Sequence, residues 1–442
     1  MNATTPYFEE THEHKDLSGV KKIGLALVSL GFLLLFVSAS GIAKEQPTLF
    51  SILIFGSIMV GTLVYVLPQL KEGPAGIKNN NIFFDSMTSK GAAAWVAGIF
   101  ITGFYVLLYW FPQYLENWIR ILDPLSFALS GGPASQWFLY GTFYTIAVVF
   151  MGVRMIVKYR HNRYQIIRTA SVMFFQLGFG FLIPNILKAF NQPEFYFTYF
   201  WPLKYDYLFP NSFEWLMSSG GIGIFMFFWG AVMTFIATPV LTYFFGKRWY
   251  CSWVCGCGGL AETLGDPYRQ LSDKSLKAWQ IERWMIHGVL AFITVTTIIV
   301  WLNSSFGGGI LGDLSNQFSQ TYGFLIGAAF SGVIGVGFYP IMGSRVWCRF
   351  GCPMAAVLGI IQKFWSRFRI TTNGGQCISC GNCSTYCEMG IDVRAYAQRG
   401  QNIIRASCVG CGICAAVCPR GVLKLENGKV EGRYELNDYV KV

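Results

Sequence analysis

The stretch IGLALVSLGFLLLFVSASGIA, residues 23–43, contains no charged residue. A bilayer core of about 30 Å requires about 20 consecutive apolar residues per helix, so this stretch is long enough to span a membrane. Comparable runs recur along the chain and predict about eight transmembrane helices, at residues 23–43, 49–69, 91–112, 136–157, 169–190, 221–245, 285–303 and 321–341. Pro184 and Asn185 interrupt the fifth run, so seven spans are the alternative.

The composition agrees with a membrane protein. Hydrophobic residues make up 53% of the 442 residues and charged residues only 13%, against about 25% charged in soluble domains. The net charge of +11 raises the question of nucleic-acid binding. The basic residues, however, lie in short clusters beside the apolar runs and not on one continuous face. Nucleic acid is therefore excluded as an expected partner.

The basic clusters predict the orientation, because Lys and Arg are enriched in short cytoplasmic loops. They follow the fourth, sixth and eighth spans: Lys158, Arg160, Arg163 and Arg168; Lys247, Arg248, Arg269, Lys274, Lys277 and Arg283; Arg345, Arg349, Lys363, Arg367 and Arg369. All three loops lie an even number of spans from the N-terminus, so both termini are predicted to be cytoplasmic. The expected location is the bacterial inner membrane, and the first span is expected to remain as an anchor because the first 20 residues are polar.

The loops on the opposite side, residues 113–135 and 191–220, are long, aromatic and poor in basic residues. Two interpretations remain open for their aromatic side chains. They form an interfacial belt, or the loops dock a partner.

All 13 cysteines lie between Cys251 and Cys418. Eight of them form two runs of the type C-x2-C-x2-C-x3-C, the spacing of bacterial ferredoxins that hold two [4Fe-4S] clusters, in which the fourth cysteine of each run binds the other cluster. The predicted ligand sets are Cys377, Cys380, Cys383 and Cys418 for one cluster and Cys408, Cys411, Cys414 and Cys387 for the second. Gly381, Gly410 and Gly412 allow the tight turns. Two zinc sites are the alternative, disfavoured because zinc motifs do not need crossing runs.

A second cysteine motif is duplicated. Residues 246–255 and 343–352 both read G-x-R-x-aromatic-C-x3-C. Positions i and i+4 of a helix share one face, so we expect Cys251, Cys255, Cys348 and Cys352 to meet and to hold an additional iron–sulfur or other metal centre. Arg248 and Arg345 are expected to offset the thiolate charge. Free thiols without metal are the alternative, and a disulfide is disfavoured on a reducing face. Cys257 has no assigned role.

Other cofactors find no support. Of the four histidines, only His287 lies in a predicted span, so the bilayer offers no pair of histidine ligands for haem. The glycine-rich stretches at residues 220–223 and 307–309 flank membrane spans and not a strand–turn–helix unit.

Residues 220–425 resemble the membrane polyferredoxin family, whose members include the NapH subunit of periplasmic nitrate reductase systems and the C-terminal half of the NosR protein of nitrous oxide respiration. The resemblance rests on Cys251, Cys255, Cys348, Cys352 and the eight ferredoxin cysteines. Two departures are that only Cys352 is followed by the usual proline and that Glu388 replaces proline after Cys387. The resemblance implies electron transfer and does not imply a substrate.

The sequence thus predicts an all-α polytopic membrane protein with a small α+β two-cluster ferredoxin-like module at its C-terminal end. The expected parts are a cytoplasmic tail, five spans, three spans with the duplicated motif, the ferredoxin module and a second tail, at residues 1–22, 23–220, 221–365, 371–425 and 426–442.

The predicted function is electron relay across the membrane, between a cytoplasmic or quinone-pool partner and an exterior acceptor, as a component of an oxidoreductase complex. Other redox subunits or soluble electron carriers are the expected partners, with quinone a further candidate, and no catalytic residue is expected. The alternatives are a copper reductase or oxidase-assembly factor, and a redox-sensing transporter. Charged residues, which usually mark a transport path, are scarce in the spans.

Overall fold

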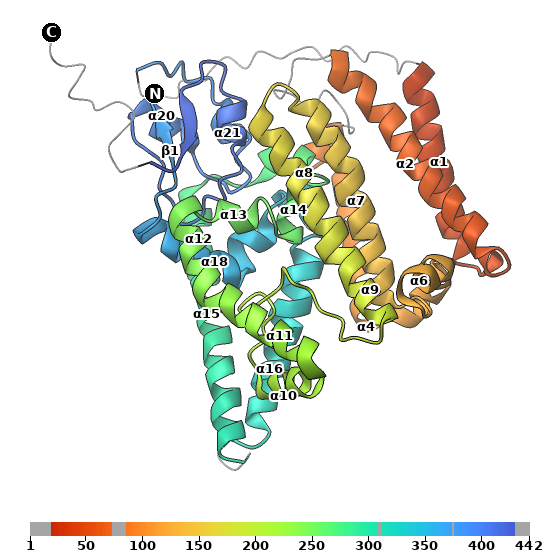
Figure 1. Ribbon diagram of the computed structural model, residues 1–442. Helices are drawn as coiled ribbons and strands as arrows, with labels where there is room; N and C mark the ends of the chain where they lie inside the picture. The colour runs from red at the N-terminus through yellow and green to blue at the C-terminus, as the bar shows by residue number, and fades with distance from the viewer. Residues whose placement is uncertain (1–18, 73–84, 308–310, 374, 429–442) are drawn as a thin grey trace, which may run out of the picture.

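A computed structural model describes residues 19–72, 85–307, 311–373 and 375–428. It confirms the predicted fold class, an all-α membrane protein that carries a small α+β module at its C-terminal end (Figure 1). Most of the two predicted tails, residues 1–22 and 426–442, lies outside the described residues.

Seven helices in the described residues are long and apolar enough to cross a membrane. They are α1 (Gly19–Ser38), α2 (Pro47–Glu72), α4 (Ala92–Trp110), α7 (Gln136–Lys158), the segment Arg163–Ala189, the segment Gly220–Phe245 and α15 (Leu276–Ser305). The eighth predicted span is wound differently: α16 (Leu314–Tyr322) continues as a π-helix over Gly323–Ile334 and is followed by turns and by α17 (Tyr339–Met342).

Prolines explain why several spans are wound irregularly. A proline has no N–H for the i−4 carbonyl and its ring crowds that carbonyl, and a local π turn is one way to accommodate it. In the fifth span, α8 (Arg163–Leu177) passes through a π turn, Gly178–Leu182, into α9 (Ile183–Ala189), whose second residue is Pro184. In the sixth, α11 (Gly220–Val232) passes through Met233–Ala237 into α12 (Thr238–Phe245), again with proline near the start. The Asn185 side chain, next to Pro184, donates from Nδ2 to the Phe181 carbonyl oxygen at 2.7 Å, so this carbonyl of the π turn has a hydrogen-bond partner.

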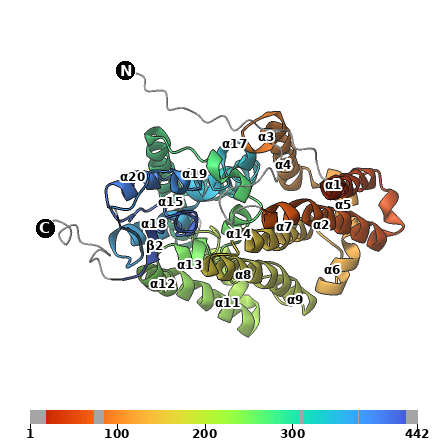
Figure 2. The same cartoon turned by 90° about the horizontal axis from the view of Figure 1, so that it is seen from above.

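Helices α1 and α2 form a pair at one edge of the bundle, away from the ferredoxin module (Figures 1 and 2). Glycines let these two helices approach closely: a Cβ on Gly24 would lie 2.7 Å from the Tyr65 amide nitrogen, and one on Gly61 would lie 2.8 Å from the Gly24 carbonyl oxygen. Small residues at helix contacts are the usual way in which membrane helices pack.

Short helices connect the spans. They are α3 (Asp85–Thr88), α5 (Glu116–Ile121), α6 (Asp123–Ser130), α10 (Pro210–Ser218), α13 (Arg248–Cys251), α14 (Gly256–Glu262) and α18 (Pro353–Phe364), with 3₁₀ turns at Ile42–Lys44, Pro112–Leu115 and Asp266–Leu271.

The C-terminal module is built on a two-stranded antiparallel sheet. Strand β1 (Arg369–Thr372) pairs with β2 (Leu423–Glu426), with Arg369 opposite Glu426. Three short helices, α19 (Asn382–Thr385), α20 (Val393–Gln398) and α21 (Ile413–Ala416), lie between the strands in sequence. The expected module boundary at residue 371 therefore falls inside β1.

The aromatic loop that follows α9 turns back into the bundle. Phe200 is buried in the same core as Cys251 and Cys255, and the Thr198 carbonyl accepts a hydrogen bond from the Tyr250 hydroxyl at 2.6 Å. This part of the loop therefore packs inside the protein, an arrangement that neither sequence-based interpretation included. Non-helical backbone at such a position is tolerated where protein surrounds it.

Candidate metal centres

The eight ferredoxin cysteines form two groups in space, each around a small cavity of about 20 Å³. One cavity is lined by Cys377, Cys380, Cys383 and Cys418. The other is lined by Cys387, Cys408, Cys411 and Cys414. The structure thus brings together the crossed quartets expected from the spacing. Gly381 and Gly412, with φ of 81° and 76°, begin the helices that carry the third cysteine of each run.

The spacing of the thiols suits a cluster better than a single ion. Four thiolates around one zinc at about 2.3 Å would bring the sulfur atoms within roughly 4 Å of one another. Within the described residues, the only group of metal-ligand types whose atoms lie within 4.8 Å of one another is Glu262, Glu388 and Cys411. The quartets are therefore wider than a zinc site, as a cubane cluster with four irons requires.

The second quartet faces the membrane helices. Gln165 of α8 donates to the Cys411 carbonyl at 2.8 Å, Gln362 of α18 donates to the Cys408 carbonyl at 2.7 Å, and Ser252 donates to the Val409 carbonyl at 2.8 Å. In the first quartet, by contrast, Cys380 is exposed. The two quartets therefore lie in series, one open to solvent and one against the membrane helices.

The four cysteines of the duplicated motif also meet. Cys251, Cys255, Cys348 and Cys352 belong to one core, with between 5% and 7% of each residue exposed. The expected geometry of two thiols on one helical face is wrong, however. Cys251 ends α13 and Cys255 is the N-cap of α14, and Cys348 lies in a π turn, Trp347–Gly351, before the N-cap Cys352 of α18.

Glycines begin both motifs. Gly246 and Gly343 have φ of 67° and 92°, conformations that L residues rarely adopt. Gly246 ends α12 of the sixth span, and Gly343 ends the short helix α17. Cys257, the thirteenth cysteine, lies beside Cys255 and within hydrogen-bonding distance of it.

Only one of the two motif arginines contacts a thiol. Arg345 Nη1 lies 3.6 Å from Cys348 Sγ and 3.3 Å from the Cys251 carbonyl oxygen. Arg248 instead lies over the Phe368 ring, 4.8 Å from its centroid. The buried Lys247, next to it, acts electrostatically on Cys251, as Arg345 also does. The expected role of Arg248 is therefore wrong, while that of Arg345 fits the geometry.

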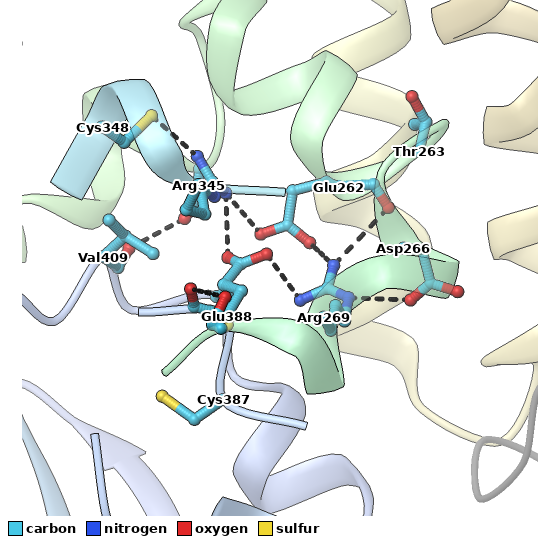
Figure 3. A network of polar contacts seen from close by, with 12 residues as sticks. Glu262, Thr263, Asp266, Arg269, Arg345, Cys348, Cys387, Glu388 and Val409 are labelled. Atoms are coloured by element: carbon cyan, nitrogen blue, oxygen red, sulfur yellow. Dashed lines mark hydrogen bonds and ion pairs between the residues drawn. The ribbon is translucent and has the colours of Figure 1, made fainter. Parts of the chain in front are cut away.

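A buried ion-pair network joins the thiol core to the ferredoxin module (Figure 3). Arg345 Nη2 lies 2.8 Å from Glu262 Oε1 and 3.0 Å from Glu388 Oε1. Arg269 contacts Glu262, lies 2.7 Å from Asp266 Oδ1 and lies 2.7 Å from Glu388 Oε2. Since Glu388 follows Cys387 directly, one arginine connects Cys348 of the membrane part with a residue adjacent to a ferredoxin cysteine.

Membrane helices extend this network. Arg154 and Lys158 of α7 each lie 2.7 Å from Asp266 Oδ2, and Arg168 of α8 lies 2.6 Å from Glu262 Oε1. Five cations therefore face three carboxylates, and all eight side chains are buried. Of these cations, Arg345 lies within 3.6 Å of the Cys348 sulfur, and a cation at that place favours the negatively charged form of this thiol.

The carboxylates of the network respond differently to their surroundings. Burial raises the pKa of Glu262, but Arg168, Arg269 and Arg345 outweigh it and hold that pKa well below its usual value. Burial raises the pKa of Glu388, and the neighbouring Glu262 carboxylate adds to the increase. Glu262 is therefore ionised, and its negative charge balances the positive charges of Arg168, Arg269 and Arg345, which all contact it.

Sequence reasoning missed this network, because it interpreted Lys158, Arg168 and Arg269 only as orientation signals and related Arg345 only to the thiols and to the orientation. The signals that could have revealed it are the acidic residues Glu262 and Asp266 in a basic loop, together with the glutamate that replaces proline after Cys387.

An aromatic cavity of about 590 Å³ reaches the thiol core from the side of the inward-folded loop. Cys257, Trp347 and Pro353 lie at the thiol core. Tyrosines from four parts of the chain line the remainder, with charged residues of the loop among them: Tyr109, Tyr140, Tyr144, Tyr196, Tyr199, Tyr205 and Tyr322, with Glu194, Lys204 and Asp206. The cavity gives a small molecule access to the thiol core.

Comparisons with known proteins agree with both cysteine sites. Residues 376–423 match a family described as a 4Fe-4S dicluster domain, and residues 227–275 and 324–373 match a 4Fe-4S binding domain. The chain is also 25% identical over 170 residues to YccM, an Escherichia coli (strain K12) protein named for a suggested role in electron transport. The match covers 33% of this chain and 43% of YccM, so it spans less than half of that relative. No solved structure matches.

The first domain contains all eight ferredoxin cysteines, and the second contains both copies of the duplicated motif. These matches support the resemblance to the membrane polyferredoxin family of 4Fe-4S electron-transfer proteins.

Proposed function

We propose that this protein relays electrons across the membrane through three redox centres in series. The exposed quartet around Cys380 is the entry or exit point on the cytoplasmic side. The quartet around Cys408 is the second centre. The four thiols of the duplicated motif hold the third. When bound, the iron–sulfur clusters supply the one-electron chemistry; the protein positions them and tunes them.

The contact between the second quartet and the duplicated motif carries this proposal. The Ser252 hydroxyl donates to the Val409 carbonyl, and these residues are the direct sequence neighbours of Cys251 and Cys408. Two cysteine sites that were 157 residues apart in the chain are therefore joined by a single hydrogen bond. Such proximity is what electron transfer between two centres requires.

The aromatic cavity is the proposed binding site for a small molecule that donates electrons to the thiol core or accepts electrons from it. Its tyrosines and tryptophans suit a planar, weakly polar redox molecule, because aromatic side chains stack on such rings. Quinone is a candidate of that class. The exchange partner at the exposed quartet would be a soluble electron carrier or another redox subunit.

The orientation follows the positive-inside rule. The ferredoxin module lies at the same end of the bundle as the start of α1 (Figure 1). The basic residues that follow α7 and α12 lie at this end as well, against the module. We propose that this end is cytoplasmic and that the membrane is the bacterial inner membrane.

Metal analysis tests the cluster assignment. Protein purified without oxygen should contain about eight iron atoms and eight sulfides for the two ferredoxin clusters, with further iron for the third centre. Cys408→Ser should lower the iron content by one cluster, because serine is a poor ligand for iron in place of a soft thiolate. Stoichiometric zinc without sulfide would contradict the proposal.

A further inference from the structure

A second large cavity, of about 740 Å³, lies between the membrane helices and the ferredoxin module. One wall is a face of α15, with Trp279, Arg283 and His287. The opposite wall is a face of α18, with Gly359 and Lys363. The roof is the ferredoxin loop at residues 404–407. The helices α15 and α18 are in contact, and both lie on the side of the bundle far from α1 and α2 (Figure 2).

The lining of this cavity is strongly basic. Its only acidic side chain, Glu282, already pairs with Arg349 at 2.7 Å. The basic side chains are Lys247, Arg283, His287, Arg349, Lys363 and Arg405. Within the described part of the chain, Arg283, Lys363 and Arg405 lie within ion-pair distance of no carboxylate. Cations that face one space repel one another and together attract an anion.

The rim of the cavity is apolar and aromatic. Leu276 of α15 and Phe364 at the end of α18 line the cavity and are 66% and 64% exposed. The exposed Trp365 follows Phe364 directly in the chain. Exposed aromatic residues beside cations are typical of the boundary between membrane and water. The cavity therefore opens where headgroups lie, with the hydrocarbon region next to it.

We propose that this cavity binds the headgroup of an anionic phospholipid, whose acyl chains lie along α15 and α18. Basic pockets between membrane helices at the cytoplasmic surface favour such headgroups. The lipid would also join the two parts of the protein. The Trp279 ring lies 5.0 Å from the guanidinium of Arg283, on the membrane helix, and 5.0 Å from that of Arg405, on the ferredoxin module. A phosphate beside this ring would neutralise one cation from each part.

Lipid titration with native mass spectrometry tests the site on the full-length, cluster-loaded protein. Purified protein in detergent micelles is mixed with phosphatidylglycerol, with phosphatidylcholine, or with phosphatidylglycerol plus inorganic phosphate. We expect preferential retention of phosphatidylglycerol. The triple variant Arg283→Gln, Lys363→Gln, Arg405→Gln should bind it roughly 100-fold more weakly, at about 1 kcal/mol for each lost cation.

A second triple variant controls for total charge. Arg163→Gln, Arg399→Gln and Lys424→Gln remove the same charge from exposed positions outside the cavity, and this variant should bind phosphatidylglycerol like the wild type. Equal losses in the two variants, or no preference over phosphatidylcholine, would contradict the proposal. Displacement by an equal concentration of inorganic phosphate would assign the cavity to a soluble anion and overturn the lipid assignment. Unchanged cluster absorption in both variants verifies that they are folded.

Discussion

The variant Cys348→Ser should lose the third metal centre and, with it, electron transfer across the membrane. Serine offers a hard oxygen where a soft thiolate is required, and Cys348 is the thiol that Arg345 contacts between the membrane part and the ferredoxin module. The iron and sulfide content should fall, and the rate at which an acceptor beyond the membrane is reduced should fall to background. The absorption and electron paramagnetic resonance signals of both ferredoxin clusters should persist.

Cys257→Ser is the matched control, because Cys257 lies beside Cys255 but outside the four-thiol set. It should retain the third centre and the transfer rate. Unchanged iron content and transfer in Cys348→Ser would show that the four thiols hold no redox centre.

The variant Glu262→Gln should destabilise the protein strongly. Glu262 pairs with Arg168, Arg269 and Arg345, and all four side chains are buried. Removing one partner of a buried ion pair leaves uncompensated charge and costs about 3–5 kcal/mol. We expect a lower midpoint of thermal unfolding and earlier loss of cluster absorption on heating, because two of these arginines, Arg269 and Arg345, also bind Glu388 of the ferredoxin module.

An exposed glutamate gives the comparison. Glu116 pairs with Arg120 one turn away on α5, with more than half of each side chain exposed, and such pairs contribute at most about 1 kcal/mol. Glu116→Gln should therefore leave the unfolding midpoint close to that of the wild type. If both variants unfold at the wild-type temperature, the network does not hold the ferredoxin module in place.

Local patterns made much of the molecule predictable. The grouping of Cys377, Cys380, Cys383 and Cys418 followed from spacing, because the ferredoxin runs set the ligand geometry within short loops. The membrane spans followed from apolar length, and even the fifth, with Pro184, is continuous in the structure. In the eighth, length alone could not reveal that Gly323–Ile334 winds as a π-helix.

Contacts between distant residues were not predictable. Arg154 and Asp266 are 112 residues apart, and Arg345 and Glu262 are 83 apart. No periodic pattern within a single sequence indicates that these residues form ion pairs. The same holds for the loop that brings Phe200 to the thiol core. The duplicated motif shows a further reason: its spacing suits one helical face, but the chain leaves the helix between the two cysteines of each copy, and Cys255 and Cys352 are helix N-caps.

Sided electron transfer in proteoliposomes tests the central claim most directly. Cluster-loaded protein is reconstituted with ferricyanide trapped inside, and a membrane-impermeant reductant is added outside, where it reaches the exposed quartet of the outward-facing molecules. The account predicts that the trapped ferricyanide is reduced at a rate proportional to the cluster-loaded protein, and that protein stripped of iron gives none. Full reduction of the ferredoxin clusters without any reduction of the trapped ferricyanide would contradict it.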